Sequence, residues 1–239
     1  MSDPVLQLHD VEASYGAFRA LFGVSLSVAE GQALAIVGPN GAGKTTVARV
    51  ASGLVAPAKG SVSIAGEDMT GKATYKFARA GVAHATEGRS VFATLSVGEN
   101  LELAFRRSKG RNGVAGALRE AFDMFPVLAE RRNQAAGTLS GGEQRMLSMA
   151  KVLVEAPKLL IADELSLGLA PVIVERTYEL LKRLRDNGTA LLVIEQHVSH
   201  ALALCDEVII LDHGGIEWQG ESKSAGDRVQ AYLYAGTTG

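Results

Sequence analysis

Residues 38–46 combine the residue types that can hold a phosphate group. Their sequence, Gly-Pro-Asn-Gly-Ala-Gly-Lys-Thr-Thr, fits the pattern G-x-x-x-x-G-K-[ST], which is typical of a phosphate-binding loop. Glycines let several backbone N–H groups converge on an anion, and the start of a helix adds further unpaired N–H groups. In this pattern Lys44 reaches the β- and γ-phosphates of a nucleotide, and Thr45 ligates Mg²⁺. The candidate phosphate-binding residues are Gly38, Asn40, Gly41, Gly43, Lys44, Thr45 and Thr46.

Two carboxylates follow a second apolar segment. Residues 158–162 (Lys-Leu-Leu-Ile-Ala) lead directly into Asp163 and Glu164. A carboxylate at the end of such a strand can hold the Mg²⁺ shell beside a phosphate loop, which is the role predicted for Asp163. Glu164 is a candidate to orient or deprotonate an attacking water. The alternative is an ordinary solvated strand end, which the phosphate loop upstream disfavours.

A second glycine-rich segment begins a predicted helix at residue 140. Ser140 suits the N-cap position, and Glu143 three residues later completes a capping box. The capping box is a sufficient explanation for these two residues, but it does not explain the consecutive Gly141 and Gly142. A serine hydroxyl with glycine N–H groups at a helix start can bind an anion. One nucleotide does not need two such sites, so two chains arranged head to tail would each lend one site to the other's nucleotide.

Continuous apolar runs indicate strands that are buried on both faces. They occupy residues 32–37, 158–162, 189–194 and 207–211. An amphipathic helix is predicted over residues 171–185, where Pro171 suits the first turn. Such strands and helices favour an α/β fold with a mostly parallel sheet. The run before Gly38 also argues against a simple glycine-rich turn that carries a chance lysine.

The middle of the chain has a different character. Residues 96–156 contain no strong strand candidate and are rich in Ala, Leu, Glu and Arg, with a predicted loop at 108–113. We interpret this stretch as a helical insertion into the α/β core. Residues 5–15 and 24–28 are shorter strand candidates, and the pair at 214–215 (Gly-Gly) predicts a late hairpin at the sheet edge.

Composition and charge restrict the function classes. The 239 residues are 47% hydrophobic and 21% charged, as in an ordinary globular protein, and the net charge of −2 argues against binding nucleic acid through bulk charge. The single cysteine, Cys205, excludes an intramolecular disulfide. The N-terminus shows no secretory signal, and no stretch offers the roughly 20 clean apolar residues of a membrane span. We therefore expect any membrane link to go through a partner.

Together these motifs resemble the nucleotide-binding subunits of ABC transporters. The resemblance extends from about residue 6 to residue 233 and rests on residues 38–46, residues 139–144 and the pair Asp163-Glu164. It implies one ABC ATPase domain over residues 1–239: a P-loop NTPase core with a mostly parallel sheet, an antiparallel β subdomain, and a helical subdomain inserted at about 96–156. The implied ligands are ATP and Mg²⁺, and the implied reaction is ATP hydrolysis. The signature residues implied to bind the nucleotide of the other subunit are Ser140, Gly141, Gly142 and Glu143.

The resemblance also implies roles for residues outside these motifs. Tyr15 corresponds to the aromatic residue that stacks on adenine, with a half-buried edge tyrosine as the alternative, and His197 corresponds to the switch histidine that contacts the γ-phosphate. Glu87 stands where the family usually has a glutamine that contacts Mg²⁺ and the attacking water. A glutamate can still accept a proton from water or approach Mg²⁺, but it adds negative charge near the phosphates. Residues 166–170 occupy the segment that crosses the dimer interface, and Leu165 replaces a usual proline.

Residues 87–92, 166–171 and 229–233 are similar to the LivF-type subunit of branched-chain amino acid importers. This similarity implies import of branched-chain amino acids or a related small amide or amino acid. It implies a peripheral location at the cytoplasmic face of the inner membrane, through binding to permease subunits. A groove near Val91 and Phe92 would receive a short helix of a permease subunit, and a substrate-binding protein would be an indirect partner. A second ABC ATPase subunit would complete a homo- or heterodimer. The alternative is a soluble ABC ATPase that acts in cofactor assembly.

Overall fold

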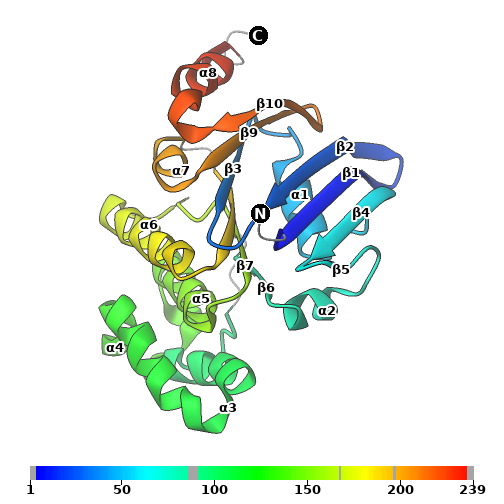
Figure 1. Cartoon of the computed structure of the whole chain (residues 1–239). Helices are drawn as coiled ribbons and strands as arrows, with labels where there is room; N and C mark the ends of the chain where they lie inside the picture. Colours follow the sequence, from blue (N-terminus) through cyan, green and yellow to red (C-terminus); the bar gives the residue numbers. More distant parts are fainter. Residues whose placement is uncertain (1–3, 86–90, 167, 196–197, 236–239) are drawn as a thin grey trace.

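The apolar runs form the central sheet of the molecule. The computed structural model describes residues 4–85, 91–166, 168–195 and 198–235, and in these ranges it contains a six-stranded sheet with the order β10-β9-β3-β8-β7-β6 (Figure 1). Neighbouring strands run parallel, except that β9 and β10 form an antiparallel hairpin. The predicted α/β class and the hairpin are confirmed. The strands are β3 (Ala33–Val37), β6 (Val82–Ala85), β7 (Leu159–Asp163), β8 (Ala190–Ile194), β9 (Glu207–Asp212) and β10 (Gly215–Glu221).

Both faces of this sheet are buried because successive residues of a strand face different cores. In β3, the side chains of Ala33, Ala35 and Val37 belong to one hydrophobic cluster, and those of Leu34 and Ile36 belong to another. All five are at most 1% exposed. Strands β7, β8 and β9 divide their side chains between the same two clusters. This double burial explains the uninterrupted apolar runs in the sequence.

An antiparallel sheet and helix α1 (Lys44–Ala51) cover one face of the central sheet. The strand order of this second sheet is β2-β1-β4-β5, and α1 contacts both sheets (Figure 1). Its strands are β1 (Leu6–Tyr15), β2 (Phe18–Val28), β4 (Lys59–Ile64) and β5 (Glu67–Asp68), and the short helix α2 (Thr74–Arg79) follows them. The implied antiparallel sheet is confirmed, although β2 begins well before the predicted strand at 24–28. The pair Ala20-Leu21 is buried between exposed Phe18, Arg19 and Phe22, so the first half of β2 lacks a clean alternation and was not recognised before Gly23.

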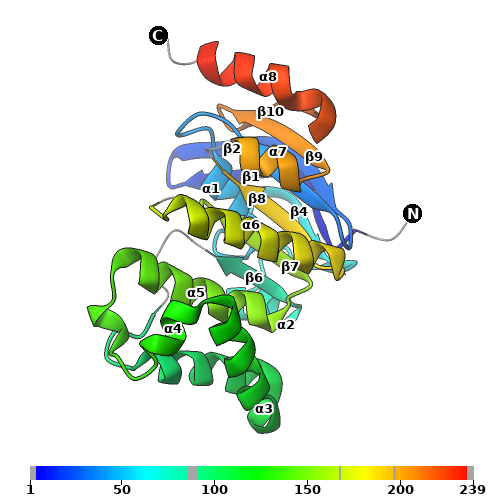
Figure 2. The ribbon, with the colours of Figure 1, turned by 90° about the vertical axis from the view of Figure 1, so that its left-hand side faces the viewer.

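Residues 97–155 form helices joined by short connections and contain no strand. Helix α3 (Val97–Met124) packs against α5 (Gly141–Glu155), with α4 (Pro126–Glu130) and the 3₁₀ turn η1 (Ala136–Thr138) between them in sequence. Figure 2 shows this group in green at one end of the molecule, opposite α8. The loop predicted at 108–113 is wrong, because α3 continues through it with one break at Gly110 (φ 66°, ψ 175°). Glycine tolerates this positive φ, so one residue suffices for the kink.

The remaining helices cover the other face and one end of the sheet. Helices α6 (Pro171–Asp186) and α7 (Val198–Leu204) lie on the side of the central sheet opposite the antiparallel sheet, and α8 (Ser222–Ala235) follows β10 (Figures 1 and 2). Pro171 occupies the first turn of α6, as the sequence predicts. Among the described helices, none combines the length and apolar character that crossing a membrane requires.

Candidate active site

Two parallel strands on either side of β8 carry candidate residues at their carboxyl ends. The strand order β3-β8-β7 places the phosphate loop after β3, and Asp163 and Glu164 at the end of β7, with β8 between them. Asp163 pairs in register with Ile194, the last residue of β8. Because the carboxyl ends of parallel strands share one edge of a sheet, segments far apart in sequence meet here.

Lys44 opens α1, and its side chain is buried inside the phosphate loop. Its Nζ donates hydrogen bonds to the carbonyl oxygens of Gly38 at 2.8 Å and Pro39 at 2.9 Å. Burial lowers the pKa of the Lys44 ammonium group, while the charges of Glu164 and Asp163 act in the opposite direction. The ammonium group therefore lies within electrostatic reach of both carboxylates predicted for the site.

The backbone of the loop is confined by its neighbours. A Cβ atom on Gly38 would lie 2.0 Å from the carbonyl oxygen of Leu211, and one on Gly43 would lie 2.9 Å from that of Ala20. Gly43 also has a φ of 102°, which disfavours any other residue there. The loop thus packs between β2 and β9 with no room for side chains at these two positions. Of the two threonines that follow Lys44, Thr45 is exposed and Thr46 is buried.

The Asp163 carboxylate is buried, with few partners. Its side chain places Oδ2 3.8 Å from Nε2 of His84, while Oδ1 has no hydrogen-bond partner among the described residues. His84 lies at the end of β6 with its Nδ1 3.0 Å from Oγ of Ser52. A buried carboxylate oxygen without a donor suits a hard cation, so these residues fit Mg²⁺. Sequence analysis missed His84, because no local pattern shows which distant strand end it faces.

Glu164 has an unusual backbone conformation directly after β7. Its φ is 53°, which is uncommon for a residue other than glycine. Two hydrogen bonds hold it: its N–H donates to the carbonyl oxygen of Ile194 at 2.9 Å, and its own carbonyl oxygen accepts from the guanidinium group of Arg145. Arg145 belongs to α5, so this bond ties the helical segment to the candidate catalytic residue.

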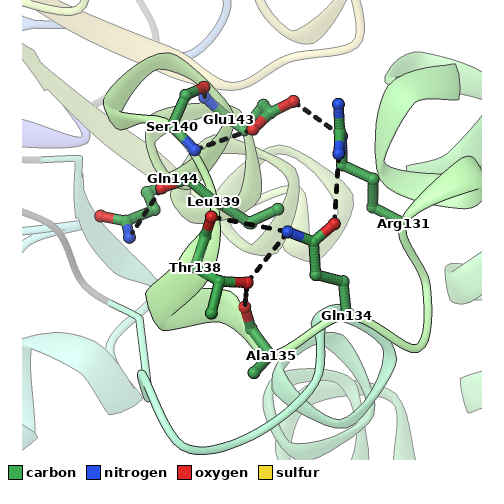
Figure 3. A network of polar contacts seen from close by, with 8 residues as sticks. All are labelled: Arg131, Gln134, Ala135, Thr138, Leu139, Ser140, Glu143 and Gln144. Carbon is green, nitrogen blue, oxygen red and sulfur yellow. Dashed lines mark hydrogen bonds and ion pairs between the residues drawn. The ribbon is translucent and has the colours of Figure 1, made fainter.

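Ser140 begins α5 and forms the predicted capping box (Figure 3). The Ser140 N–H donates to Oε2 of Glu143 at 2.8 Å, and the Glu143 N–H donates to Oγ of Ser140 at 3.3 Å. Glu143 also pairs with Arg131, whose Nε lies 2.7 Å from Oε1. The backbone hydrogen bond from Ser140 is the main cause that lowers the pKa of the Glu143 carboxyl group. The Glu143 carboxylate thus stabilises the start of α5 through its hydrogen bond with Ser140 and its ion pair with Arg131.

The two glycine-rich helix starts lie on different parts of the chain. Helix α1 packs against β1, β2, β7 and β8, whereas α5 packs against α3, α4, α6 and β6. Ser140 and Gly141 are exposed, and a Cβ atom added to Gly142 would meet no atom within 4 Å. The start of α5 therefore presents backbone N–H groups and a hydroxyl group at an open surface.

Tyr15 lies at the end of β1. The residue is 41% exposed, and its hydroxyl oxygen accepts a hydrogen bond from Arg49 of α1 at 3.3 Å. Its phenol group therefore lies beside the helix that starts at the phosphate loop. Phe92 is also exposed, with Nζ of Lys151 5.4 Å from its ring centroid. Glu87 and His197 lie outside the described residues, so their roles stay predictions.

Similarity to known proteins identifies the family of this chain. The model of the ABC transporter family matches residues 21–166. The chain belongs to the ABC transporter family. It is 38% identical over 213 residues to BraG of Pseudomonas aeruginosa, a high-affinity branched-chain amino acid transport ATP-binding protein, which covers 89% of this chain and 91% of BraG. It is 33% identical over 217 residues to the probable branched-chain amino acid transport ATP-binding protein LivF of Archaeoglobus fulgidus, covering 90% and 92%.

The fold of this chain is similar to those of solved ATP-binding subunits of ABC transporters. The ATP-binding subunit of an ABC transporter superposes with a TM-score of 0.85 at 26% identity, covering 96% of this chain and 94% of that one. The ADP conformation of MJ1267, an ATP-binding cassette, gives a TM-score of 0.80 at 25% identity, covering 97% and 99%. This ABC chain is accordingly an ATP-binding transport ATPase, and the alternative of a cofactor-assembly ATPase is not supported.

Proposed function

We propose that this ABC ATPase hydrolyses Mg·ATP at the carboxyl edge of β3, β8 and β7. Lys44 binds the β- and γ-phosphates, Thr45 and Asp163 ligate Mg²⁺, and Glu164 orients or deprotonates the attacking water. The observation that carries this proposal is the burial of Lys44 and Asp163 at one edge, where Oδ1 of Asp163 lacks a donor among the described residues. Mg²⁺, when bound, neutralises charge on the phosphates. Backbone and side-chain contacts come from Gly38, Asn40, Gly41, Gly43 and Thr46.

Two chains would bind two nucleotides between them. The exposed start of α5, with Ser140, Gly141 and Gly142, serves the nucleotide of the second subunit, and Glu143 supports it through the capping box. The separation of α5 from α1 in one chain supports this arrangement, because it leaves the second anion site available to a partner. The cassette MJ0796, which shares this fold, forms a dimer. Tyr15 stacks on adenine beside α1. We keep His197 as the γ-phosphate contact and Glu87 as a contact to water and Mg²⁺.

The transporter context follows from the relatives. BraG and LivF are named as branched-chain amino acid transport ATP-binding proteins, so we assign import of branched-chain amino acids or a related small amide or amino acid. The chain acts on the cytoplasmic face of the inner membrane, bound to permease subunits near Val91 and Phe92, with a substrate-binding protein as an indirect partner. Residues 1–239 form one ABC ATPase domain, with the helices of 96–156 as its inserted subdomain.

The catalytic assignment is tested by the variant Glu164→Gln in the assembled transporter. The variant retains ATP binding, because the phosphate loop and Asp163 are unchanged, but loses nearly all turnover. Glu175→Gln, the same change at an exposed position of α6, is the matched control and hydrolyses ATP normally. ATP affinity by equilibrium binding and phosphate release measure the two effects. Unchanged steady-state hydrolysis in Glu164→Gln would contradict the role given to Glu164.

The transport assignment is tested by copurification. Tagged wild-type chain should bring down permease subunits, and a branched-chain amino acid loaded on the binding protein should stimulate ATP hydrolysis by the complex. The variant Phe92→Asp should lose the permease subunits without losing its folded circular dichroism spectrum. Stimulation by a solute of another chemical class would overturn the cargo, and unchanged copurification of Phe92→Asp would overturn the docking surface.

A further inference from the structure

A buried carboxylate at the end of β8 has no part in the chemistry described so far. Glu195 is 2% exposed and directly follows Ile194. Its Oε1 accepts a hydrogen bond from the backbone N–H of Ser166 at 3.1 Å, and its Oε2 accepts one from Oγ of Ser166 at 2.8 Å. Both carboxylate oxygens are thus satisfied by a single residue on the neighbouring strand connection.

Fold stability alone does not explain a carboxylate at this position. Taking a carboxylate out of water is costly unless its hydrogen bonds compensate, and apolar pairs of similar size often replace buried polar pairs without loss. The hydroxyl group of Tyr178, on α6, is also buried; burial raises its pKa, and the charge of Glu195 is the next largest cause. The two hydrogen bonds from Ser166 compensate the burial of the Glu195 carboxylate, so removing them would leave a buried charge without its donors.

The position of the pair suggests what it does. Ser166 lies two residues after Glu164, and the Glu164 N–H already bonds to the carbonyl oxygen of Ile194, next to Glu195. The Glu195 N–H in turn bonds to the carbonyl oxygen of Ile36 in β3 at 3.4 Å. Glu195 therefore joins the ends of β3, β8 and β7, which carry the phosphate loop and the acidic pair.

The pair also stands where two functional segments begin. The chain continues from Ser166 into residues 168–170, part of the segment that the family resemblance places at the dimer interface. From Glu195 it continues to His197, the predicted γ-phosphate contact, two residues later in sequence. The two hydrogen bonds between Ser166 and Glu195 therefore connect the residues from which these two segments start.

We propose that Glu195 is a positioning residue for ATP hydrolysis. Its carboxylate holds Ser166, and through Ser166 it holds the backbone of Glu164 and the start of the interface segment in the geometry that turnover requires. This inference rests on the proposed role of Glu164. Small displacements of catalytic groups lower rates steeply, so the link affects kcat more than nucleotide affinity.

The test is a double-mutant cycle on Glu195→Gln and Ser166→Ala in the assembled transporter. Each single variant should lower kcat about tenfold or more, with a change in the KM for ATP of less than about twofold. Both changes act on the hydrogen bond from Oγ of Ser166 to Oε2 of Glu195, whereas the backbone N–H of Ser166 keeps an oxygen acceptor in either variant. The double variant should therefore lose no more than the worse single variant. The variant Ser166→Ala removes a single oxygen atom, so it keeps the test decisive if Glu195→Gln fails to fold.

The control removes a buried hydroxyl group on helix α6. Thr177 on α6 is 1% exposed and donates to the carbonyl oxygen of Ile173 at 2.7 Å, so Thr177→Val should lower thermal stability without lowering kcat. Unchanged kcat in the two single variants, or losses that simply add in the double variant, would overturn the proposal. Normal turnover of Glu164→Gln would instead show that the proposed function of Glu164 fails, so the two failures are distinguishable.

Discussion

The side chain of Ser140 is both a helix cap and a proposed phosphate contact, and substitutions at this residue can test the two roles separately. The variant Ser140→Ala removes the acceptor for the Glu143 N–H at 3.3 Å, but it keeps the bond from the Ser140 N–H to the Glu143 carboxylate. Since half of the capping box survives, we expect a loss of about 0.5–1 kcal/mol, at the low end for N-caps. In a chain of this length that lowers the melting temperature by about 1–4 °C.

The variant Ser140→Asp separates the two roles. Aspartate is as good an N-cap as serine, so the melting temperature of Ser140→Asp should stay near the wild-type value. Its negative charge, however, would face the γ-phosphate of the partner's nucleotide. Ser140→Ala should reduce ATP turnover by about 10²–10³, as expected for the loss of one donor to a developing charge, and Ser140→Asp should reduce it further.

The assay combines thermal unfolding, followed by circular dichroism, with phosphate release by the assembled transporter. A cap-only role predicts that stability falls in Ser140→Ala and that turnover stays normal in both variants. Wild-type turnover in Ser140→Asp would therefore refute the argument for a second anion site at the start of α5, whatever the effect on stability.

Three further predictions concern Tyr15, Glu143 and Phe105. Tyr15→Ala should weaken ATP binding, measured by equilibrium titration, by roughly 1–3 kcal/mol, the range for base stacking. Tyr15→Phe keeps the ring and should bind ATP normally. Equal losses of affinity in the two variants would instead indicate that the hydrogen bond between the Tyr15 hydroxyl group and Arg49 matters. The lowered pKa of Glu143 adds stability above its ordinary pKa of 4.5, and that stability is lost as the pH falls through the lowered value. The melting temperature should therefore differ between wild type and Glu143→Gln at pH 7, and this difference should shrink below pH 4.5; a constant difference would contradict the charge effect. Phe105 is fully buried in α3. The variant Phe105→Ala should lower the free energy of unfolding, measured with denaturant, by about 3–5 kcal/mol. A decrease of less than about 1 kcal/mol would show that the helical segment contributes little to global stability.

Features set by residues close in sequence were predictable. The capping box needs only Ser140 and Glu143, and the start of α6 needs only Pro171, so sequence analysis placed both. The buried strands were also predictable, because burial on both faces leaves an apolar run. Strands β4 and β5 were missed, since they are short and largely exposed and their residues lack a clear period.

Features set by contacts across the fold were not predictable. His84 approaches Asp163, and Ser166 donates two hydrogen bonds to Glu195. Each pair joins residues in or just after different strands, and nothing near any of these residues in sequence signals the partner. Gly110 shows a subtler limit: its surroundings have the composition of a loop, yet packing against α5 keeps the helix on both sides. Tertiary contacts override local propensity in that case.

Ser140 caps the start of helix α5, and Arg145 follows five residues later in the same helix. In the proposed dimer, Ser140 faces the nucleotide of the second subunit. The guanidinium group of Arg145, about 8 Å further along the axis, donates a hydrogen bond to the carbonyl oxygen of Glu164 in its own subunit. A shift of α5 that brought Ser140 onto the partner's phosphate would therefore also act on the backbone of Glu164. In the proposed dimer, contact of one subunit with its neighbour's ATP would then be transmitted along α5 to the residue proposed to activate water in its own site.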